Sequence, residues 1–254
     1  MSIFLEMAKV QYLKFKFHCR YMKDTALKNH SNQVQHELNV RGYSILDEFL
    51  SRDSALKLGK EFEMHLKNRN NISDIKSDSR DFYIDQAVTG AQDFKRDNTL
   101  IEIGSNHLKK DLRAFFTMGN AVYSGAHASS GGNWHRDSVA PQFKVMVYLT
   151  DVEENNGAFQ IYPGTQNAPE LVKILRLLSV APNIHRFAAD THEVLAANGV
   201  YPKTLTGLAG TAILFNSSTL HRGSPIKEGK RMAMTNYYFP ASANINKLKQ
   251  HFPK

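Results

Sequence analysis

The sequence predicts a mainly β protein with helical support, arranged as an antiparallel barrel or a double-sheet jelly roll. Two observations carry this prediction. Helical patterns gather in the first half of the 254-residue chain. From about Asn120 onward, short β-rich runs separated by Gly, Asn and Pro replace them. Helices followed by many short strands favour an antiparallel fold over alternating parallel units.

Composition narrows the classes of protein to which the chain can belong. Hydrophobic residues make up 42% of the sequence, an ordinary value for a globular domain with a core. The single cysteine, Cys19, cannot form an internal disulfide, which favours a reducing compartment. No apolar run has the length of a membrane span, and the N-terminus lacks a signal-peptide core. We therefore expect a cytoplasmic protein.

The formal net charge of the chain is +8. A basic surface attracts nucleic acid, anionic membranes or anionic small molecules, and it also keeps a protein soluble without any such partner. The charge alone leaves these interpretations open.

The chain is predicted to form one domain preceded by an extension. Residues 1–33 are basic, and their stretch VQYLKFKFHCRYMK fits either an amphipathic helix or an edge strand. Residues 34–254 contain no clear linker and are expected to form a single domain, with an inserted helix and loop at about 168–206.

Elements in the first half of the domain follow from local pattern. GYSIL, at 42–46, predicts a short strand. LSRDSALKLGKEFEMHL, at 50–66, predicts a helix with Ser51 or Ser54 as its cap. Residues 68–100 are polar and irregular, and we expect a long surface loop of the kind that borders a site. The apolar residues at helical spacing, expected to face the core, are Ala55, Leu58, Phe62 and Leu66.

A second helix is predicted at 109–122, from KKDLRAFFTMGNAV, with Leu112, Phe115 and Phe116 facing inward. Within the insertion, APELVKILRLL predicts a further helix, followed by an irregular stretch to about Thr206. The β-rich runs are AVYSGAHAS, FKVMVYLTDV, AFQIYPG, GTAILFNSS and RMAMTNYYFP.

Three residues form a candidate metal site: His135, Asp137 and His221. Residues i and i+2 of a strand point to the same face, so His135 and Asp137 aim at one point. His221 follows the apolar strand GTAILFNSSTL and supplies a third group from a distant part of the chain. Two imidazoles and one carboxylate on one face of an ion match the facial triad of non-haem Fe(II) oxygenases.

Arg231 supports this interpretation, because it begins another alternating run ten residues after His221. A guanidinium is a planar fork that matches a carboxylate, and a buried one needs an anionic partner. A dicarboxylate cosubstrate that chelates iron at one end would pair with Arg231 at the other. Ser224 is expected to donate a second hydrogen bond to that distal carboxylate.

Taken in order, four stretches resemble the phytanoyl-CoA dioxygenase family of Fe(II)/2-oxoglutarate-dependent oxygenases, and they cover roughly residues 34 to 240. Two positions depart from the family's pattern. Gln166 stands where the family usually has a histidine that is not a metal ligand, and Ser224 lies one place further from the distal histidine. The four stretches are RGYSILDEFLSRDSALKL, NWHRD, VYLTDVEENNGAFQIYPGTQ, and GLAGTAILFNSSTLHRGSP with Arg231.

The resemblance implies a double-stranded β-helix, the cupin-like jelly roll, with the metal in its mouth. It implies Fe(II) held by His135, Asp137 and His221, with 2-oxoglutarate as cosubstrate on Arg231, and O2 as oxidant. The expected reaction is hydroxylation of an aliphatic C–H bond in a small or medium polar or anionic metabolite derived from a sugar, lipid or amino acid, with release of succinate and CO2. Asp137 favours hydroxylation over halogenation, because halogenating relatives replace this carboxylate with Gly or Ala.

Several side chains are candidates for the neighbouring cavity. On 143–149, alternation separates Lys144, Met146 and Tyr148 from an all-apolar face. Lys144 either meets 2-oxoglutarate or an anionic substrate, or it extends to solvent. Tyr148 and Arg222 are further candidates for substrate binding, and Tyr123 for binding the cosubstrate. Trp134 and Arg136 are expected to point away from the metal.

Other functions remain as alternatives. The same cofactors also support desaturation, cyclisation or epimerisation, which differ in how the substrate is placed. Nucleic-acid demethylation would suit the net charge, but no second Arg follows Arg231 in the run MAMTNYYF, and no nucleic-acid partner is expected. A jelly roll that binds metal without catalysis is the last alternative.

Overall fold

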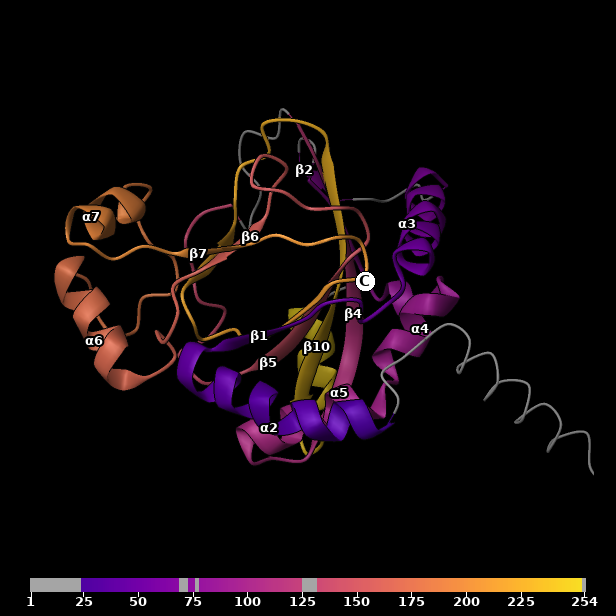
Figure 1. Ribbon diagram of the computed structural model, residues 1–254, viewed down its shortest axis with the longest axis horizontal. Coiled ribbons are helices and arrows are strands. Elements are labelled where there is room, and N and C mark those ends of the chain that lie inside the picture. The colour runs from indigo at the N-terminus through magenta and orange to yellow at the C-terminus, as the bar shows by residue number, and fades with distance from the viewer. Residues whose placement is uncertain (1–23, 69–72, 76–77, 125–131, 253–254) are drawn as a thin grey trace, which may run out of the picture.

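Two antiparallel sheets form the body of the protein, as the computed structural model shows for residues 24–68, 73–75, 78–124 and 132–252 (Figure 1). The smaller sheet has the order β7 (Lys203–Leu205), β6 (Phe159–Ile161), β9 (His221–Gly223). Together with the larger sheet, it forms the double-sheet jelly roll that the sequence predicts, and that prediction is confirmed. The larger sheet has the order β1 (Tyr43–Leu46), β8 (Ala212–Asn216), β5 (Phe143–Tyr148), β10 (Lys230–Pro240), β4 (Leu112–Tyr123), β3 (Asp78–Phe82), β2 (Ser73–Ile75).

One face of the larger sheet is covered by helices, which supply a single apolar cluster together with the strands beneath them. Figure 1 shows α3 and α4 together on one side of the sheets and α2 beside α5. The covering helices are α2 (Asp24–Arg41), α3 (Arg52–Lys67), α4 (Thr89–Lys95) and α5 (Asn98–Leu108).

Helix α3 agrees with the sequence prediction in both its cap and its buried face. Ser51 precedes the helix, and its hydroxyl accepts a hydrogen bond from the backbone N–H of Ser54 at 3.3 Å. This bond satisfies one of the amides that a helix start leaves without a partner. The four residues at helical spacing, Ala55, Leu58, Phe62 and Leu66, are all buried.

Strand β5 separates its two faces as predicted. Phe143, Val145 and Val147 belong to the cluster under the helices. Met146 and Tyr148 belong to a second cluster, which also contains residues of the smaller sheet and therefore lies between the two sheets. The interior of the jelly roll is thus the face of β5 that carries Lys144.

The prediction of a helix at 109–122 is wrong. Most of this segment is strand β4, which pairs with β10 on one side and with β3 on the other. Its residues from Phe116 to Val122 are all buried. A strand buried on both faces lacks alternation, so periodicity cannot separate it from a buried helix.

The long loop predicted at 68–100 is also wrong within the described residues, which contain β2, β3, the short 3₁₀ helix η1 (Ile84–Gln86), α4 and the start of α5. Polar residues there are satisfied inside the fold. The buried Asp85 accepts from the backbone N–H of Thr117 at 2.8 Å and from Lys95 Nζ at 2.6 Å. Such buried polar partners give a structured segment the composition of a loop.

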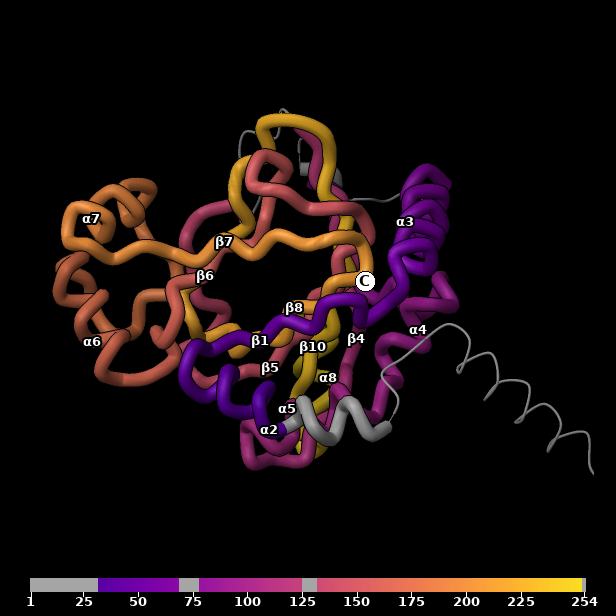
Figure 2. Tube along the Cα trace, viewed as in Figure 1, coloured from indigo at the N-terminus to yellow at the C-terminus, as the bar shows by residue number. Residues whose placement is uncertain are grey.

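The insertion contains the predicted helix, α6 (Ala168–Leu177), together with α7 (Thr191–Ala197) and β7, which replace the expected irregular stretch. Figure 2 shows the chain leaving this lobe through β7 and returning to the body. The predicted domain boundary at residue 34 lies inside α2. Residues 1–23, with Cys19, and the end of AVYSGAHAS fall outside the described residues.

The helices in the described part of the chain include none with both the length and the hydropathy of a membrane span.

Gly59 allows α3 to lie close to the segment that follows β5. A Cβ at this position would approach the Leu149 carbonyl oxygen to 2.9 Å. We expect Gly59→Ala to lower the free energy of unfolding by about 1–2 kcal/mol, because overpacking outweighs the helix propensity of alanine. Urea denaturation measures this change. Lys60→Ala, at an exposed position of the same helix, is the control and should shift stability by less than about 0.5 kcal/mol.

Candidate metal centre

The candidate site is built on a pair of backbone hydrogen bonds between residues distant in sequence. The N–H of His135 donates to the carbonyl of His221, and the N–H of His221 donates to the carbonyl of His135, both at 2.9 Å. Residues that pair in this way project their side chains to the same side of a sheet. The two imidazole rings accordingly lie 4.4 Å apart between centroids.

Asp137 completes the group. Its backbone N–H donates to the carbonyl of Ser217 at 3.0 Å. Its Oδ1 lies 3.8 Å from His135 Nε2, and its Oδ2 lies 3.6 Å from His221 Nε2. One ligand atom from each residue lies within 4.8 Å of the other two, so the three residues form a compact group able to bind an ion.

Both histidines are oriented by backbone carbonyls. His135 Nδ1 lies 2.7 Å from the Asn133 carbonyl, and His221 Nδ1 lies 2.7 Å from the Thr219 carbonyl. A carbonyl only accepts, so each Nδ1 carries the proton and each Nε2 keeps its lone pair. Hydrogen bonding of the second ring nitrogen is the usual way in which proteins hold a metal-binding histidine.

The electrostatics of the group favour neutral imidazoles beside an ionised carboxylate. Burial lowers the pKa of His135 to about 3, and the charges of His221 and Arg186 act in the same direction. Burial also lowers the pKa of His221. For Asp137, burial acts to raise the pKa, but Lys144 and the two histidines hold it well below its usual range. These are the protonation states that a metal requires.

Lys144 has a partner that the sequence interpretation did not identify. It is buried on the interior face of β5, with Nζ 2.8 Å from Asp137 Oδ2 and 3.7 Å from the centroid of the Tyr237 ring. Lys144 therefore neutralises and orients Asp137.

Arg231 lies on the interior face of β10 and is buried. Its Nη1 donates to the Gly157 carbonyl at 2.6 Å, and its Nη2 donates to Asn120 Oδ1 at 2.8 Å. Gly223 gives the guanidinium its space, because a Cβ there would lie 2.9 Å from Nη1. Both acceptors are neutral, and the buried carboxylate of Asp78, whose charge acts on Arg231, is already paired with Arg80, so the guanidinium can still pair with an anionic ligand.

Donors without a partner are found on Arg231 itself and on Ser224, close to it in sequence. Among the described residues, neither Arg231 Nε nor Ser224 Oγ has a hydrogen-bond partner. Ser224 follows Gly223, the residue whose backbone lies against the guanidinium. A carboxylate accepts from both kinds of donor, which fits the role expected for Arg231 and Ser224.

Of the three other predicted residues, Tyr123 and Arg222 point away from the interior, whereas Tyr148 lies in it near Arg231. Tyr123 packs against the cluster under the helices, on the opposite face of the larger sheet. The Tyr148 hydroxyl lies inside but already donates to the Leu205 carbonyl at 2.8 Å and accepts from the Phe159 N–H at 3.0 Å. Arg222 points away from His221, 4.5 Å from the centroid of the Trp134 ring, and donates to Gln160 at 2.8 Å.

The structure adds two residues that sequence reasoning missed, Asn120 and Arg186. Asn120 lies in the segment wrongly predicted as a helix, so the direction of its side chain was not available. Arg186 forms an antiparallel bridge with His135 from within the insertion, where no periodic pattern indicated a strand. Alternation did place Trp134 correctly, since it is buried beside Tyr162, away from the metal group.

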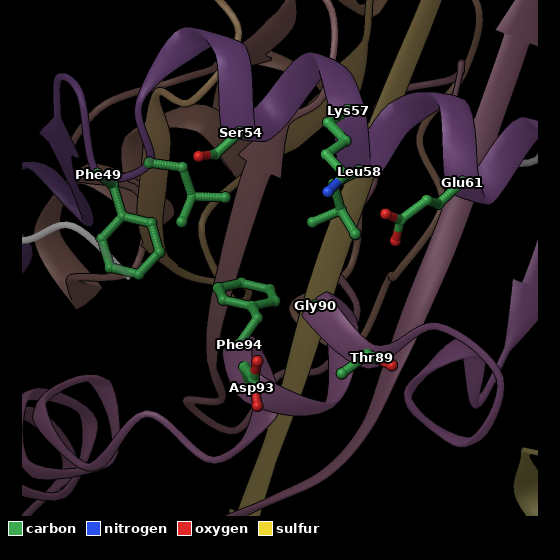
Figure 3. A pocket seen from close by; sticks show the side chains of 10 residues that line it. Phe49, Ser54, Lys57, Leu58, Glu61, Thr89, Gly90, Asp93 and Phe94 are labelled. Carbon is green, nitrogen blue, oxygen red and sulfur yellow. The ribbon is translucent and has the colours of Figure 1, made fainter. Parts of the chain in front are cut away.

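A cavity of about 650 Å³ opens beside Asp137 and Lys144, and residues from the insertion and from the C-terminal helix α8 (Ile245–His251) also line it. Its size falls within the range typical of small-molecule sites. A second hollow of about 160 Å³ lies between α3 and α4, far from these residues, and is lined by Leu58, Phe94 and their neighbours (Figure 3). We assign the larger cavity to the candidate site.

Comparison with known proteins finds one family model that matches most of the chain. The family model "Phytanoyl-CoA dioxygenase (PhyH)" matches residues 38–233. No curated protein matches the sequence.

Solved structures share the fold at low sequence identity. The non-heme α-ketoglutarate-dependent epimerase SnoN from nogalamycin biosynthesis is 12% identical, with 85% of this chain and 84% of that chain covered and a TM-score of 0.63. The carbocyclase SnoK from the same biosynthesis is 15% identical, with 85% and 86% covered and a TM-score of 0.63. HygX from Streptomyces hygroscopicus, with nickel and 2-oxoglutarate bound, is 15% identical, with 83% and 87% covered and a TM-score of 0.58.

Replacement of His135 tests the metal group without reference to any reaction. We expect His135→Ala to weaken Mn(II) binding at least about 100-fold, because it removes one of three ligands. Isothermal titration calorimetry measures this affinity. His36→Ala, at an exposed position on α2, is the control and should bind Mn(II) as the wild type does. Equal affinity in His135→Ala and wild type would contradict the assignment.

Proposed function

Because the chain belongs to the phytanoyl-CoA dioxygenase family, we propose that it is an Fe(II)- and 2-oxoglutarate-dependent oxygenase that hydroxylates an aliphatic C–H bond of a small or medium polar or anionic metabolite. The observation that carries the proposal is the convergence of His135, Asp137 and His221 beside a buried cation, Arg231. A triad alone binds many ions. A triad with a buried guanidinium in the same interior suits a metal together with an anionic cosubstrate.

The donor set fits Fe(II) and 2-oxoglutarate. His135, Asp137 and His221 would hold the metal through two nitrogens and one carboxylate, a set that leaves further positions open. Arg231 and Ser224 would hold the distal carboxylate of 2-oxoglutarate with donors that have no partner among the described residues. Burial lowers the pKa of Arg231, but a guanidinium stays protonated at any pH of interest. Arg231 therefore carries a positive charge with which an anionic ligand can pair.

Bound Fe(II) and 2-oxoglutarate supply the oxidising chemistry, in which O2 is consumed, succinate and CO2 are released and a C–H bond of the substrate is oxidised. The chain's own residues orient and protect these groups. The carbonyls of Asn133 and Thr219 fix the two imidazoles. Lys144 fixes one oxygen of Asp137, and Asn120 and Gly157 aim the guanidinium of Arg231. The apolar cluster between the sheets excludes water from the interior.

The same cofactors also support desaturation, cyclisation and epimerisation. These reactions remain alternatives because two similar structures are an epimerase and a carbocyclase. The reaction followed depends on which C–H bond lies nearest the metal. Asp137 retains the carboxylate that halogenating relatives lack, which favours hydroxylation over halogenation. We also favour a small-molecule substrate over a nucleic acid, since the similar structure of HygX has been solved with a small molecule, hygromycin B, bound.

Replacement of Arg231 tests cosubstrate binding. We expect Arg231→Gln to weaken 2-oxoglutarate binding about 10- to 100-fold, because a charge-assisted pair with a carboxylate is lost. The visible charge-transfer absorption of the Fe(II)–2-oxoglutarate chelate, titrated without oxygen, measures this affinity. Arg176→Gln removes the same charge from an exposed position on α6 and should leave the affinity unchanged.

A turnover screen tests the reaction itself. Wild-type protein with Fe(II), 2-oxoglutarate, ascorbate and metabolite pools should release succinate in proportion to one consumed metabolite. The product should gain 16 mass units if it is hydroxylated. A loss of 2 mass units would instead support desaturation or cyclisation. If wild-type protein binds both Fe(II) and 2-oxoglutarate yet never forms succinate, the proposed oxygenase function is wrong.

A further inference from the structure

The large cavity beside the metal group is lined mainly by cationic and aromatic side chains. Its charged lining comprises five basic residues and a single acidic one, Asp137. Loading with Fe(II) and 2-oxoglutarate adds charges of opposite sign and similar size, so the lining keeps its positive excess. A concave site lined by one sign of charge concentrates ligands of the opposite sign. The five basic residues are Arg80, Lys110, Arg136, Lys144 and Arg186.

The partners of three of these cations are well defined. Arg80 pairs with Asp78 at 3.0 Å, and Lys144 pairs with Asp137 at 2.8 Å. Arg136 is buried and donates to two backbone carbonyls. Arg186 differs by its position, because its backbone pairs with that of the metal ligand His135.

Arg186 faces the same side of the smaller sheet as the metal ligands. Its bridge with His135 continues the row of paired residues Ile161, His221 and His135. Paired residues in a row share a face, so the side chain of Arg186 projects to the metal side, at the cavity. Arg186 is exposed, so a ligand that enters this cavity can reach it.

Arg136 holds the segment that carries Arg186. Its Nη2 donates to the carbonyls of Pro182 at 2.9 Å and Ile184 at 2.6 Å. Its backbone N–H donates to the His185 carbonyl at 2.9 Å, and the Phe187 N–H donates to the Trp134 carbonyl at 3.0 Å. Bonds on both sides of Arg186 fix its backbone relative to His135. The backbone position from which the Arg186 side chain starts is therefore set by the fold, which lowers the cost of ordering that side chain on a ligand.

The cavity also has an aromatic wall, which we define as Phe82, Tyr237, Phe239 and Phe252. The ring of Phe252 lies 5.7 to 6.3 Å from the other three rings, measured between centroids. The Tyr83 hydroxyl donates to the Phe252 carbonyl at 2.7 Å and so fixes the end of α8 at the cavity. Such a wall favours an apolar, ring-bearing body.

We propose that Arg186 is the anion-binding residue of the substrate site, and that the substrate carries a carboxylate or phosphate joined to an apolar, ring-bearing body that packs on the aromatic wall. This proposal rests on the proposed function, because it names the substrate class of that same site. It replaces Lys144 and Arg222 as the expected anion anchors. Lys144 is committed to Asp137, and Arg222 packs on Trp134.

The test measures binding of four probes to protein loaded with Fe(II) and 2-oxoglutarate in the absence of oxygen. The probes are 3-phenylpropanoate, phenyl phosphate, 3-phenylpropanamide and inorganic phosphate, and calorimetry reports each Kd. Saturating 2-oxoglutarate keeps the probes away from Arg231. We expect one of the two ring-bearing anions to bind at least about 10-fold more tightly than the neutral amide and than inorganic phosphate. The two anions distinguish a carboxylate from a phosphate substrate.

Arg186→Gln should remove the preference for the anion over the amide, and Arg176→Gln should keep it, since Arg176 is exposed on α6 outside the cavity. Equal binding of amide and anions by wild type, or an anion preference that survives in Arg186→Gln, would overturn the proposal. Binding of inorganic phosphate as tight as that of phenyl phosphate would overturn the part played by the aromatic wall. Failure of the protein to bind Fe(II) and 2-oxoglutarate would instead count against the proposed function.

Discussion

The two hydrogen bonds that join the backbones of His135 and His221 are the constraint on which the rest of the site depends. They fix the register between the segment that contains Trp134 to Arg136 and strand β9. Because side chains alternate along a strand, a shift of one residue in this segment would send the imidazole of His135 to the outer face and bring Trp134 inside, while β6 would keep His221 in place. The metal group, the row that ends at Arg186 and the packing of Trp134 therefore follow from one register.

Buried charge is the second organising feature. Lys144 and Asp137 compensate each other, whereas Arg231 is buried with neutral acceptors at its two Nη atoms. A buried charge without a counterion is costly, and a protein keeps one where a ligand supplies the compensation. The interior thus divides into a metal-binding group that is nearly neutral and a cation that needs an anion. That division matches a site for a metal and a dicarboxylate side by side.

Much of this arrangement follows from the sequence by alternation. His135 and Asp137 share a face because they lie two residues apart, and the two faces of β5 differ because its apolar residues alternate with Lys144. The strand β4 was not predictable in this way, since it is buried on both faces and reads like a helix. The contact between Asn120 and Arg231 therefore could not be predicted. Arg186 lies in a segment with no pattern of its own, and only its bridge to His135 brings it to the site. Sequence pattern thus identifies residues on regular strands and misses those placed by long-range pairing.

The most direct test of the central claim is an anomalous diffraction map, measured at the iron absorption edge, from crystals prepared without oxygen in Fe(II) and 2-oxoglutarate. A single strong peak bonded to His135, Asp137 and His221 is expected, with a carboxylate of 2-oxoglutarate in hydrogen-bond contact with Arg231. An iron peak elsewhere, or a cosubstrate that leaves Arg231 without an anion, would contradict the account.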